Sequence, residues 1–216
     1  MKDVQRQSMM YQRRCLGVLC MLLAPSSILF GLFGLSTNYP EWYKSISATY
    51  FANDKCLMIG LLYAISVFFI SYKGYDIKDR VCAIIEAISA IGIVLFPCKC
   101  PGIPDRIGMF NLPMNVSNIF HCVFAAVLFT TFTFNILVLF RLSGPEPTEK
   151  KKLRNTIYLI CGIIMAIFLI LQSMCEVIGP YLPSWFPLTW FNEFMMLEAF
   201  GFAYLVKSEA IAKLND

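Results

Sequence analysis

The sequence predicts an all-α, polytopic membrane protein, a bundle of six transmembrane helices. Hydrophobic residues make up 58% of the 216 residues and charged residues only 15%, and the mean hydropathy is +0.65. A soluble domain of this size could not cover so much apolar surface with so few charges. The apolar residues also gather in runs of about 17 to 25, the length that a helix needs to cross a bilayer. Because the hydrophobicity is continuous rather than alternating, the sequence excludes a β-barrel.

Six apolar runs define the expected spans, and together they form a single transmembrane domain over residues 1–216. The third run is the shortest. Each run is expected to be a helix, because lipid offers no hydrogen-bond partner to a bare backbone amide. The spans are expected at 15–35, 56–72, 81–96, 116–140, 157–174 and 188–206.

The first run follows two arginines and resembles the start of a signal peptide. Its apolar stretch of about 20 residues is longer than the apolar region of a signal peptide, and it ends in LSTNYP without a small-x-small cleavage site. We therefore expect a retained helix.

The later runs are separated by two kinds of connection. The segments 73–80 and 141–154 are rich in basic residues, and the second begins with the turn-forming Gly and Pro of SGPEPTEKKKLR. The segments 36–55, 97–115 and 175–187 hold few basic residues. The last of them contains three prolines and no Lys or Arg, so we expect a stiff loop that is partly immersed in the membrane.

The distribution of basic residues predicts that both termini are cytoplasmic. With six spans, the termini share one side with the connections 73–80 and 141–154. That side holds all of the 18 Lys and Arg residues except Lys44, Lys55, Lys99 and Arg106. The positive-inside rule assigns this side to the cytoplasm, so the formal charge of +4 reflects orientation and not nucleic-acid binding. We expect an integral protein of the plasma (inner) membrane, with membrane lipids as partners and no nucleic acid.

Four ionisable residues lie inside the expected spans: Glu86, His121, Glu193 and Glu198. A charge at the bilayer centre costs about 2.5 to 3.5 kcal/mol on insertion scales, and no Lys or Arg lies within a span to neutralise the glutamates. Each glutamate must be protonated, hydrated or hydrogen-bonded by neutral groups. For Glu198, near mid-membrane, the expected partners are polar residues of the fourth span, Thr130, Thr131, Thr133 and Asn135.

The segment SISATYF, residues 45–51, lies between the first two spans on the outer side. The predicted topology brings its hydroxyl groups to the same leaflet as His121, which is the only histidine, and Glu193. We expect an outward-facing polar pocket that binds a lipid headgroup or a small amphiphile, without a cofactor or a metal. Its expected ligand-binding residues are Ser45, Ser47, Tyr50, His121 and Glu193.

Three other interpretations stay open. Serine, histidine and carboxylate are the ingredients of an intramembrane hydrolase, although no complete catalytic motif is present. A proton-coupled transporter would use Glu86 and Glu198, but the sequence shows no internal repeat. The hydroxyl residues of the 45–51 segment are also suited to capping the second helix or its preceding turn, as are Asn53 and Asp54.

Five of the nine cysteines map to the outer side, namely Cys56, Cys98, Cys100, Cys122 and Cys175. In an oxidising compartment they allow one or two disulfides. The C-x-C pair with a third thiol and His121 could also supply Zn²⁺ ligands. This spacing is not specific to zinc, so small apolar packing is the expectation for these cysteines.

Several short stretches resemble a group of uncharacterised six-span integral membrane proteins of bacteria. They are YPEWYKSISATYF, ISYKGYD with Asp79 after it, LFP at 95–97, His121 with Ala125 and Phe129, RNTIYLICG, and the stretch from Glu193 to Gly201. The residues that this resemblance singles out are Ser45, Ser47, Tyr50, Tyr75, Asp76, Asp79, His121, Tyr158, Gly162, Glu193 and Lys207. This chain departs from the group at Ala203, Tyr204 and Ser208, where the group has Trp and Gly.

The resemblance implies a fold and a membrane location. It implies no activity, because no activity is established for the group. A weaker, architectural likeness connects the chain with Frag/DRAM/Sfk-like membrane proteins, which are linked to lipid and autophagy processes. That likeness rests on the number of spans and on a serine-bearing first outer loop, so it implies no specific site.

Overall fold

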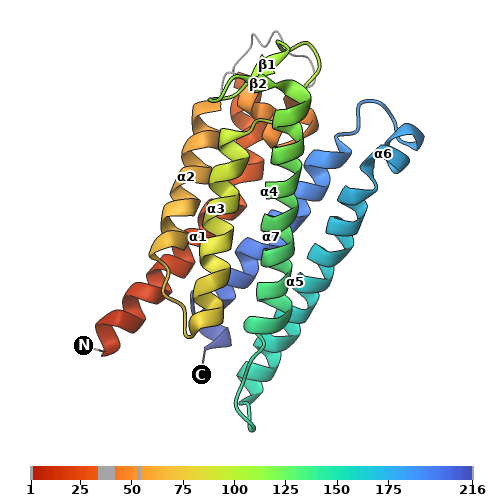
Figure 1. The fold of residues 1–216 in the computed structure, drawn as a ribbon. Coiled ribbons are helices and arrows are strands. Elements are labelled where there is room, and N and C mark those ends of the chain that lie inside the picture. The colour runs from red at the N-terminus through yellow and green to blue at the C-terminus, as the bar shows by residue number, and fades with distance from the viewer. Residues whose placement is uncertain (1, 34–41, 53–54, 216) are drawn as a thin grey trace.

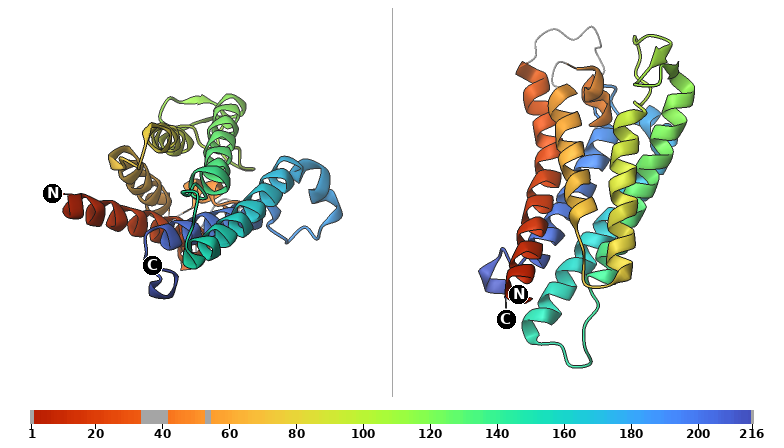
Figure 2. Two further views of the ribbon diagram at one scale, coloured as in Figure 1. Left: turned by 90° about the horizontal axis from the view of Figure 1, so that it is seen from below. Right: turned by 60° about the vertical axis from the view of Figure 1, so that its left-hand side comes forward.

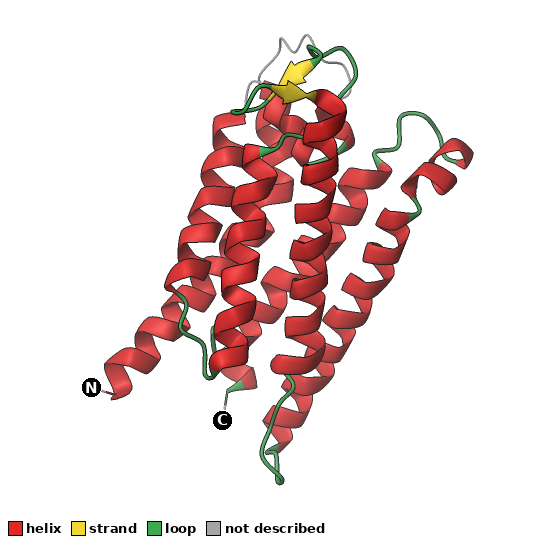
Figure 3. Cartoon of the chain, in the orientation of Figure 1, coloured by secondary structure: helices red, strands yellow, loops and turns green. Residues whose placement is uncertain are grey.

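The computed structural model describes residues 2–33, 42–52 and 55–215, and these residues form an all-α protein. The strands among them are the two-residue β1, Arg106–Ile107, and β2, Leu112–Pro113, which pair in an antiparallel ribbon. Helix accounts for most of the rest, and loops connect the helices (Figure 3). The prediction of an all-α fold is therefore confirmed.

The long helices cover the six apolar runs of the sequence. Their bounds are α1 Lys2–Phe33, α2 Lys55–Ser71, α3 Ile77–Leu95, α4 Met114–Phe134, α5 Glu149–Ser173 and α7 Leu188–Lys207. Shorter elements complete the description: the 3₁₀ helices η1 Trp42–Lys44, η2 Ser47–Phe51, η4 Gly179–Tyr181 and η5 Ala212–Leu214, the π-helix η3 Asn135–Leu139, and α6 Cys175–Ile178. The capping candidates Asn53 and Asp54 lie outside the described residues.

Local side chains explain where several helices begin and end. The carboxylate of Asp76 accepts a hydrogen bond from the amide of Asp79 at 3.0 Å and so caps α3. The hydroxyl of Thr148 caps α5 in the same way, with 3.1 Å to the amide of Lys151. Both contacts satisfy an amide that has no partner within the first turn of its helix.

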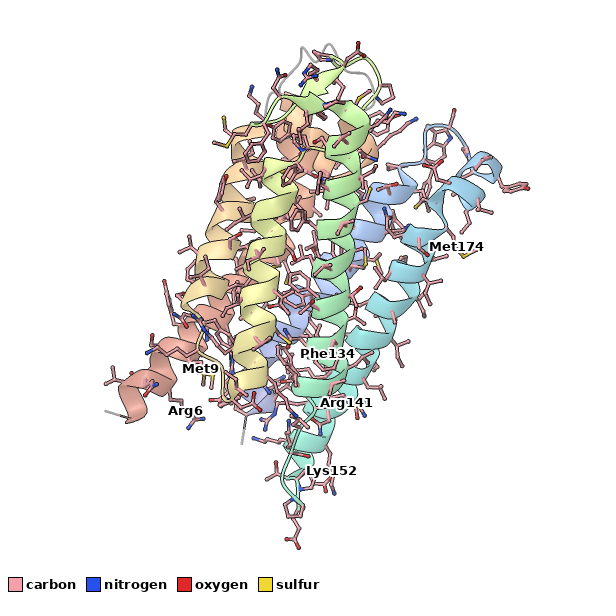
Figure 4. The ribbon with its side chains drawn as sticks, in the orientation of Figure 1. Arg6, Met9, Phe134, Arg141, Lys152 and Met174 are labelled. Atoms are coloured by element: carbon pink, nitrogen blue, oxygen red, sulfur yellow. The ribbon has the colours of Figure 1, made fainter. Side chains whose placement is uncertain are left out.

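The helices lie side by side in the spatial order α5, α7, α1, α2, α3, α4 (Figures 1 and 2). Both chain termini lie at one end of this assembly, called the terminal end here, and the β1–β2 ribbon lies at the other, called the hairpin end. Near the terminal end, α5 contacts the π-helix that continues α4. Toward the hairpin end α4 and α5 diverge, where Met174 marks the end of α5 (Figure 4).

Aromatic rings fill the centre of the helical assembly. The rings of Phe132 on α4 and Phe200 on α7 stack with 3.5 Å between their centroids, and both are almost fully buried. Phe69 of α2 and Tyr204 of α7 pack against this pair. Three helices that are distant in sequence thus share one core.

The helices α1 and α7 approach each other through glycines. A Cβ atom placed on Gly201 would lie 2.6 Å from the carbonyl oxygen of Gly17 and 2.4 Å from Cγ of Met21. A Cβ atom on Gly17 would lie 2.8 Å from the carbonyl oxygen of Gly201. No real side chain fits at such distances, so this crossing requires glycine on both helices.

Two helical stretches, Met114–Leu139 and Glu149–Ser173, are long and apolar enough to cross a membrane. Only 39% and 22% of their apolar windows are buried inside the structure, whereas an apolar core helix of a soluble protein is mostly buried. The helix Lys55–Ser71 is also apolar but shorter. Length, composition and exposure therefore support a membrane location.

Replacing Gly201 by Ala is expected to lower the free energy of unfolding by about 1 to 3 kcal/mol, because the methyl group overpacks the α1–α7 crossing. Gly60 of α2 is the matched control, since nothing lies within 4 Å of a Cβ atom placed there. Gly60→Ala is expected to raise the same quantity by roughly 0.5 to 1 kcal/mol. Thermal unfolding in detergent measures both, and equal shifts for the two variants would contradict the crossing.

Candidate functional site

A cavity of about 730 Å³ lies at the hairpin end between α4 and α5, called the outer cavity here. Its walls also come from the segment 44–48, the loop 97–101, and the first turns of α7. The volume falls within the range of about 300 to 1,000 Å³ that is typical of small-molecule sites. Four of the five predicted ligand-binding residues line it, namely Ser45, Ser47, His121 and Glu193.

Glu193 fixes the wall that the 45–51 segment contributes. One of its carboxylate oxygens, Oε2, accepts a hydrogen bond from the backbone amide of Ile46 at 2.6 Å. The hydroxyl of Ser45 accepts from the amide of Ala48 at 2.9 Å, and the hydroxyl of Thr49 donates to the carbonyl of Ile46 at 2.6 Å. Ser45 therefore stabilises the turn that leads into η2, as the capping interpretation predicts, while it also lines the cavity.

His121 joins α4 to the loop that follows α3. Its Nδ1 atom lies 2.8 Å from the carbonyl oxygen of Phe96. A carbonyl oxygen only accepts, so Nδ1 is assigned the proton and donates this bond. One turn earlier, the hydroxyl of Ser117 donates to the carbonyl of Pro97 at 2.8 Å, and the side-chain oxygen of Asn118 accepts from the amide of Lys99 at 2.7 Å. The first turns of α4 thus hold the loop 96–99 beside the cavity.

The hydrogen bonds of Ser45, His121 and Glu193 run to backbone groups. Within the described part of the chain, these three side chains make no hydrogen bond to one another. A Ser-His-acid hydrolase needs its nucleophile, base and acid within hydrogen-bond reach. Ser45, His121 and Glu193 are therefore not linked into the hydrogen-bonded relay that such a hydrolase uses.

The structure does not bring Tyr50 to the outer cavity. Its ring packs edge-on against Phe51, with 5.1 Å between the centroids, and against the apolar core. It also interacts with Tyr63 of α2. The 45–51 segment thus lies at the hairpin end, but the contacts of the Tyr50 ring are with Phe51 and Tyr63, and the ring does not line the cavity.

Sequence reasoning missed the contribution of α5 and α6 to the cavity. Gln172, Ser173 and Glu176 line it, together with Thr189 at the start of α7. Gln172 is held in place because its side-chain oxygen accepts a hydrogen bond from the side-chain amide of the buried Asn192 at 3.2 Å. The signal available in the sequence was the pair of polar residues, Gln172 and Ser173, at the outer end of the fifth apolar run.

The lining changes from polar to apolar along both helices that flank the cavity. On α4, Asn118 and His121 lie near the hairpin end, and Ala125, Ala126 and Phe129 follow deeper. At 1.5 Å per residue, His121 and Phe129 are about 12 Å apart along the helix. On the antiparallel α5, Gln172 and Ser173 face the polar part and Leu169 the apolar part. The cavity is therefore amphipathic.

A second cavity of about 40 Å³ lies deeper, called the inner cavity here. It shares Ser47, Ala125, Phe129 and Glu193 with the outer cavity. The rest of its lining is apolar, with Cys20 at α1 and Phe132 and Leu197 from the core. Its volume suffices for about one water molecule, so it is no site for a long acyl chain.

Three cysteines, Cys98, Cys100 and Cys122, line the outer cavity, and all three are free thiols. Burial raises the pKa of the Cys98 thiol, and the negative charge of Glu193 raises it further. Cys98 is therefore a neutral thiol at physiological pH, which is the unreactive form. The described residues contain no group of three or more His, Cys, Asp or Glu side chains that could hold a metal ion.

The interior glutamates differ from expectation in their partners. Asn135 donates a hydrogen bond to Glu86 Oε1, whereas the sequence suggested Asn135 as a partner for Glu198. The hydroxyls of Thr131 and Thr133 donate to carbonyls within their own helix, those of Val127 and Phe129, both at 2.8 Å. Glu198 Oε1 is buried and has no hydrogen-bond partner among the described residues. The polar stretch of the fourth span, Thr130 included, is thus not a partner surface for Glu198.

The other residues singled out by the resemblance gather at the terminal end. The ammonium group of Lys207 lies 5.4 Å from the ring centroid of Tyr75 and 5.9 Å from that of Tyr158. Asp79 accepts a hydrogen bond from the amide of Tyr75 at 2.9 Å, beside the capping residue Asp76. Gly162 packs against Leu137, where a Cβ atom would lie 2.3 Å from Cδ2. These residues join α5, α7 and the loop before α3, far from the outer cavity.

Comparisons with known proteins gave no relative. No protein-family model, no curated protein and no solved structure matches the chain. The resemblance to the uncharacterised bacterial group therefore stays a prediction.

Removing the carboxylate of Glu193 is expected to free the 45–51 segment. Leaving a buried donor without its acceptor costs about 1 to 3 kcal/mol, so Glu193→Ala should speed hydrogen exchange at the amide of Ile46 by about 5- to 150-fold. Glu193→Gln keeps an acceptor oxygen and should cause a smaller change. Exchange of the Lys99 amide, bonded to Asn118, is the internal control. Unchanged exchange at Ile46 in the alanine variant would refute this anchoring role.

Proposed function

We propose that all six long helices cross the membrane, with the hairpin end outside and the terminal end in the cytoplasm. The support is the apolar surface, because large hydrophobic side chains are exposed on every one of these helices. Examples are Val18 on α1, Val67 on α2, Ile88 on α3, Val123 on α4, Ile167 on α5 and Phe202 on α7. An apolar surface that surrounds a protein fits lipid as its solvent.

The function supported best is binding of a lipid headgroup or small amphiphile in the outer cavity. The observation that carries this proposal is the change in the cavity lining. Along both α4 and α5, the lining residues are polar at the hairpin end and apolar deeper in the protein. An amphiphile that stands in the outer leaflet has its polar head at the interface and its chain toward the midplane. The polar lining with His121 and Glu193 matches the head, and the lining with Ala126, Phe129 and Leu169 matches the chain.

The topology predicts which loops an external reagent reaches. A cysteine introduced at Asn111, in the turn between β1 and β2, should react with a membrane-impermeant maleimide in intact cells. A cysteine at the exposed Glu146, in the connection between η3 and α5, should react only after the cells are opened. Labelling is measured by the mass shift, in a background with the native cysteines replaced. Labelling of both positions in intact cells would contradict six spans.

Filling the apolar part of the outer cavity is expected to expel the ligand. Ala126→Trp places an indole between α4 and α5, and a clash with the ligand of about 1 to 3 kcal/mol corresponds to roughly 5- to 150-fold weaker binding. Val127→Trp is the matched control, because Val127 is 40% exposed on the next position of α4 and does not line the cavity. Native mass spectrometry of the purified protein measures the fraction that carries a bound amphiphile. Equal occupancy in both variants would overturn the proposal.

A further inference from the structure

Glu86 is a buried acid that the proposed amphiphile site does not use. Its side chain on α3 is 0% exposed. One oxygen, Oε1, accepts the hydrogen bond from the side-chain amide of Asn135, which is the first residue of the π-helix η3. The other oxygen, Oε2, is buried and has no hydrogen-bond partner within the described ranges. A buried polar atom without a partner calls for a physical explanation.

Among the described residues, Glu86 forms no ion pair with a Lys, Arg or His side chain. The groups that interact with it electrostatically are Asp79 and Cys82 on its own helix, Cys20 on α1 and Tyr204 on α7. Cys20 also interacts with Glu198, whose Oε1 atom is another buried oxygen that has no hydrogen-bond partner among the described residues. Every one of these neighbours is acidic or neutral. An ionised carboxylate is strongly disfavoured in such a place unless a cation neutralises it.

We infer that Glu86 is a proton-binding site in the interior of the protein, with an exchangeable proton on its carboxyl group and Asn135 as the neutral donor that orients it. The proton sits on Oε2, which is the oxygen that the Asn135 amide leaves unoccupied. When this proton leaves, it passes to water, and the carboxylate that remains requires hydration. Hydration requires α3 to move away from α4 or from η3, against which it packs, so the protonation state is coupled to the packing of these helices.

The inner cavity lies on the hairpin side of Glu86, because Ile93, two turns further along α3, lines it. Cys20, which interacts with Glu86, lines the inner cavity. The inner cavity shares Ser47 and Glu193 with the outer cavity and has room for about one water molecule. This inference is independent of the amphiphile proposal, because it needs no ligand in the outer cavity.

Infrared spectroscopy of the purified protein at neutral pH tests the inference. The difference spectrum between the wild type and Glu86→Gln is expected to contain the C=O band of one protonated carboxylic acid, and this band should shift to lower frequency in D₂O. Glu198→Gln serves as the control: its own spectrum should retain the Glu86 band, which therefore cancels in the difference spectrum between the wild type and Glu198→Gln. A carboxylate band in the first difference spectrum, or a band that does not shift in D₂O, would overturn the inference.

A second measurement covers the case in which Glu86→Gln does not fold. Wild-type protein labelled with ¹³C at the glutamate side-chain carboxyl should show an isotope shift of a protonated-acid band. If the labelled wild type shows no such band at neutral pH, the inference is wrong, and no variant is needed to reach that conclusion.

Discussion

The carboxylate of Glu193 accepts a hydrogen bond from the backbone amide of Ile46, and the hairpin end depends on this contact. The segment 45–51 has only 3₁₀ turns of its own, which leave it few internal hydrogen bonds. Glu193 ties this segment to α7, 147 residues further along the chain. This contact holds one wall of the outer cavity in place. It also gives the buried carboxyl group of Glu193 a hydrogen-bond donor in place of the water that it loses on burial. A single bond thereby serves both the fold and the candidate site.

The shape of the cavity follows from how the helices pack elsewhere. The glycines Gly17 and Gly201 let α1 and α7 approach closely, and Gly162 lets α5 approach the π-helix near the terminal end. No comparable glycine contact joins α4 and α5 at the hairpin end within the described residues. The two helices are thus held together at one end and diverge at the other, which leaves space lined by polar residues outside and by apolar residues inside.

The sequence predicted the fold class and the helices well, because continuous apolar runs have one structural solution in lipid. It also predicted that Ser45, Ser47, His121 and Glu193 lie at one end of the protein. This follows because successive helices run in opposite directions, so alternate connections lie at the same end. It could not predict the direction in which η2 turns Tyr50, nor that Asn135 would pair with Glu86 instead of Glu198. Those details depend on helix rotation and on the π-helix, which apolar periodicity does not encode. The share of α5 in the cavity was missed for the same reason.

The most direct test of an amphiphile site is an experimental structure of the protein in a lipid nanodisc. The account predicts density for one amphiphile in the outer cavity, with its head beside Glu193 and Gln172 and its chain along Phe129 and Leu169. A cavity that holds only water, or α4 and α5 closed against each other at the hairpin end, would contradict it.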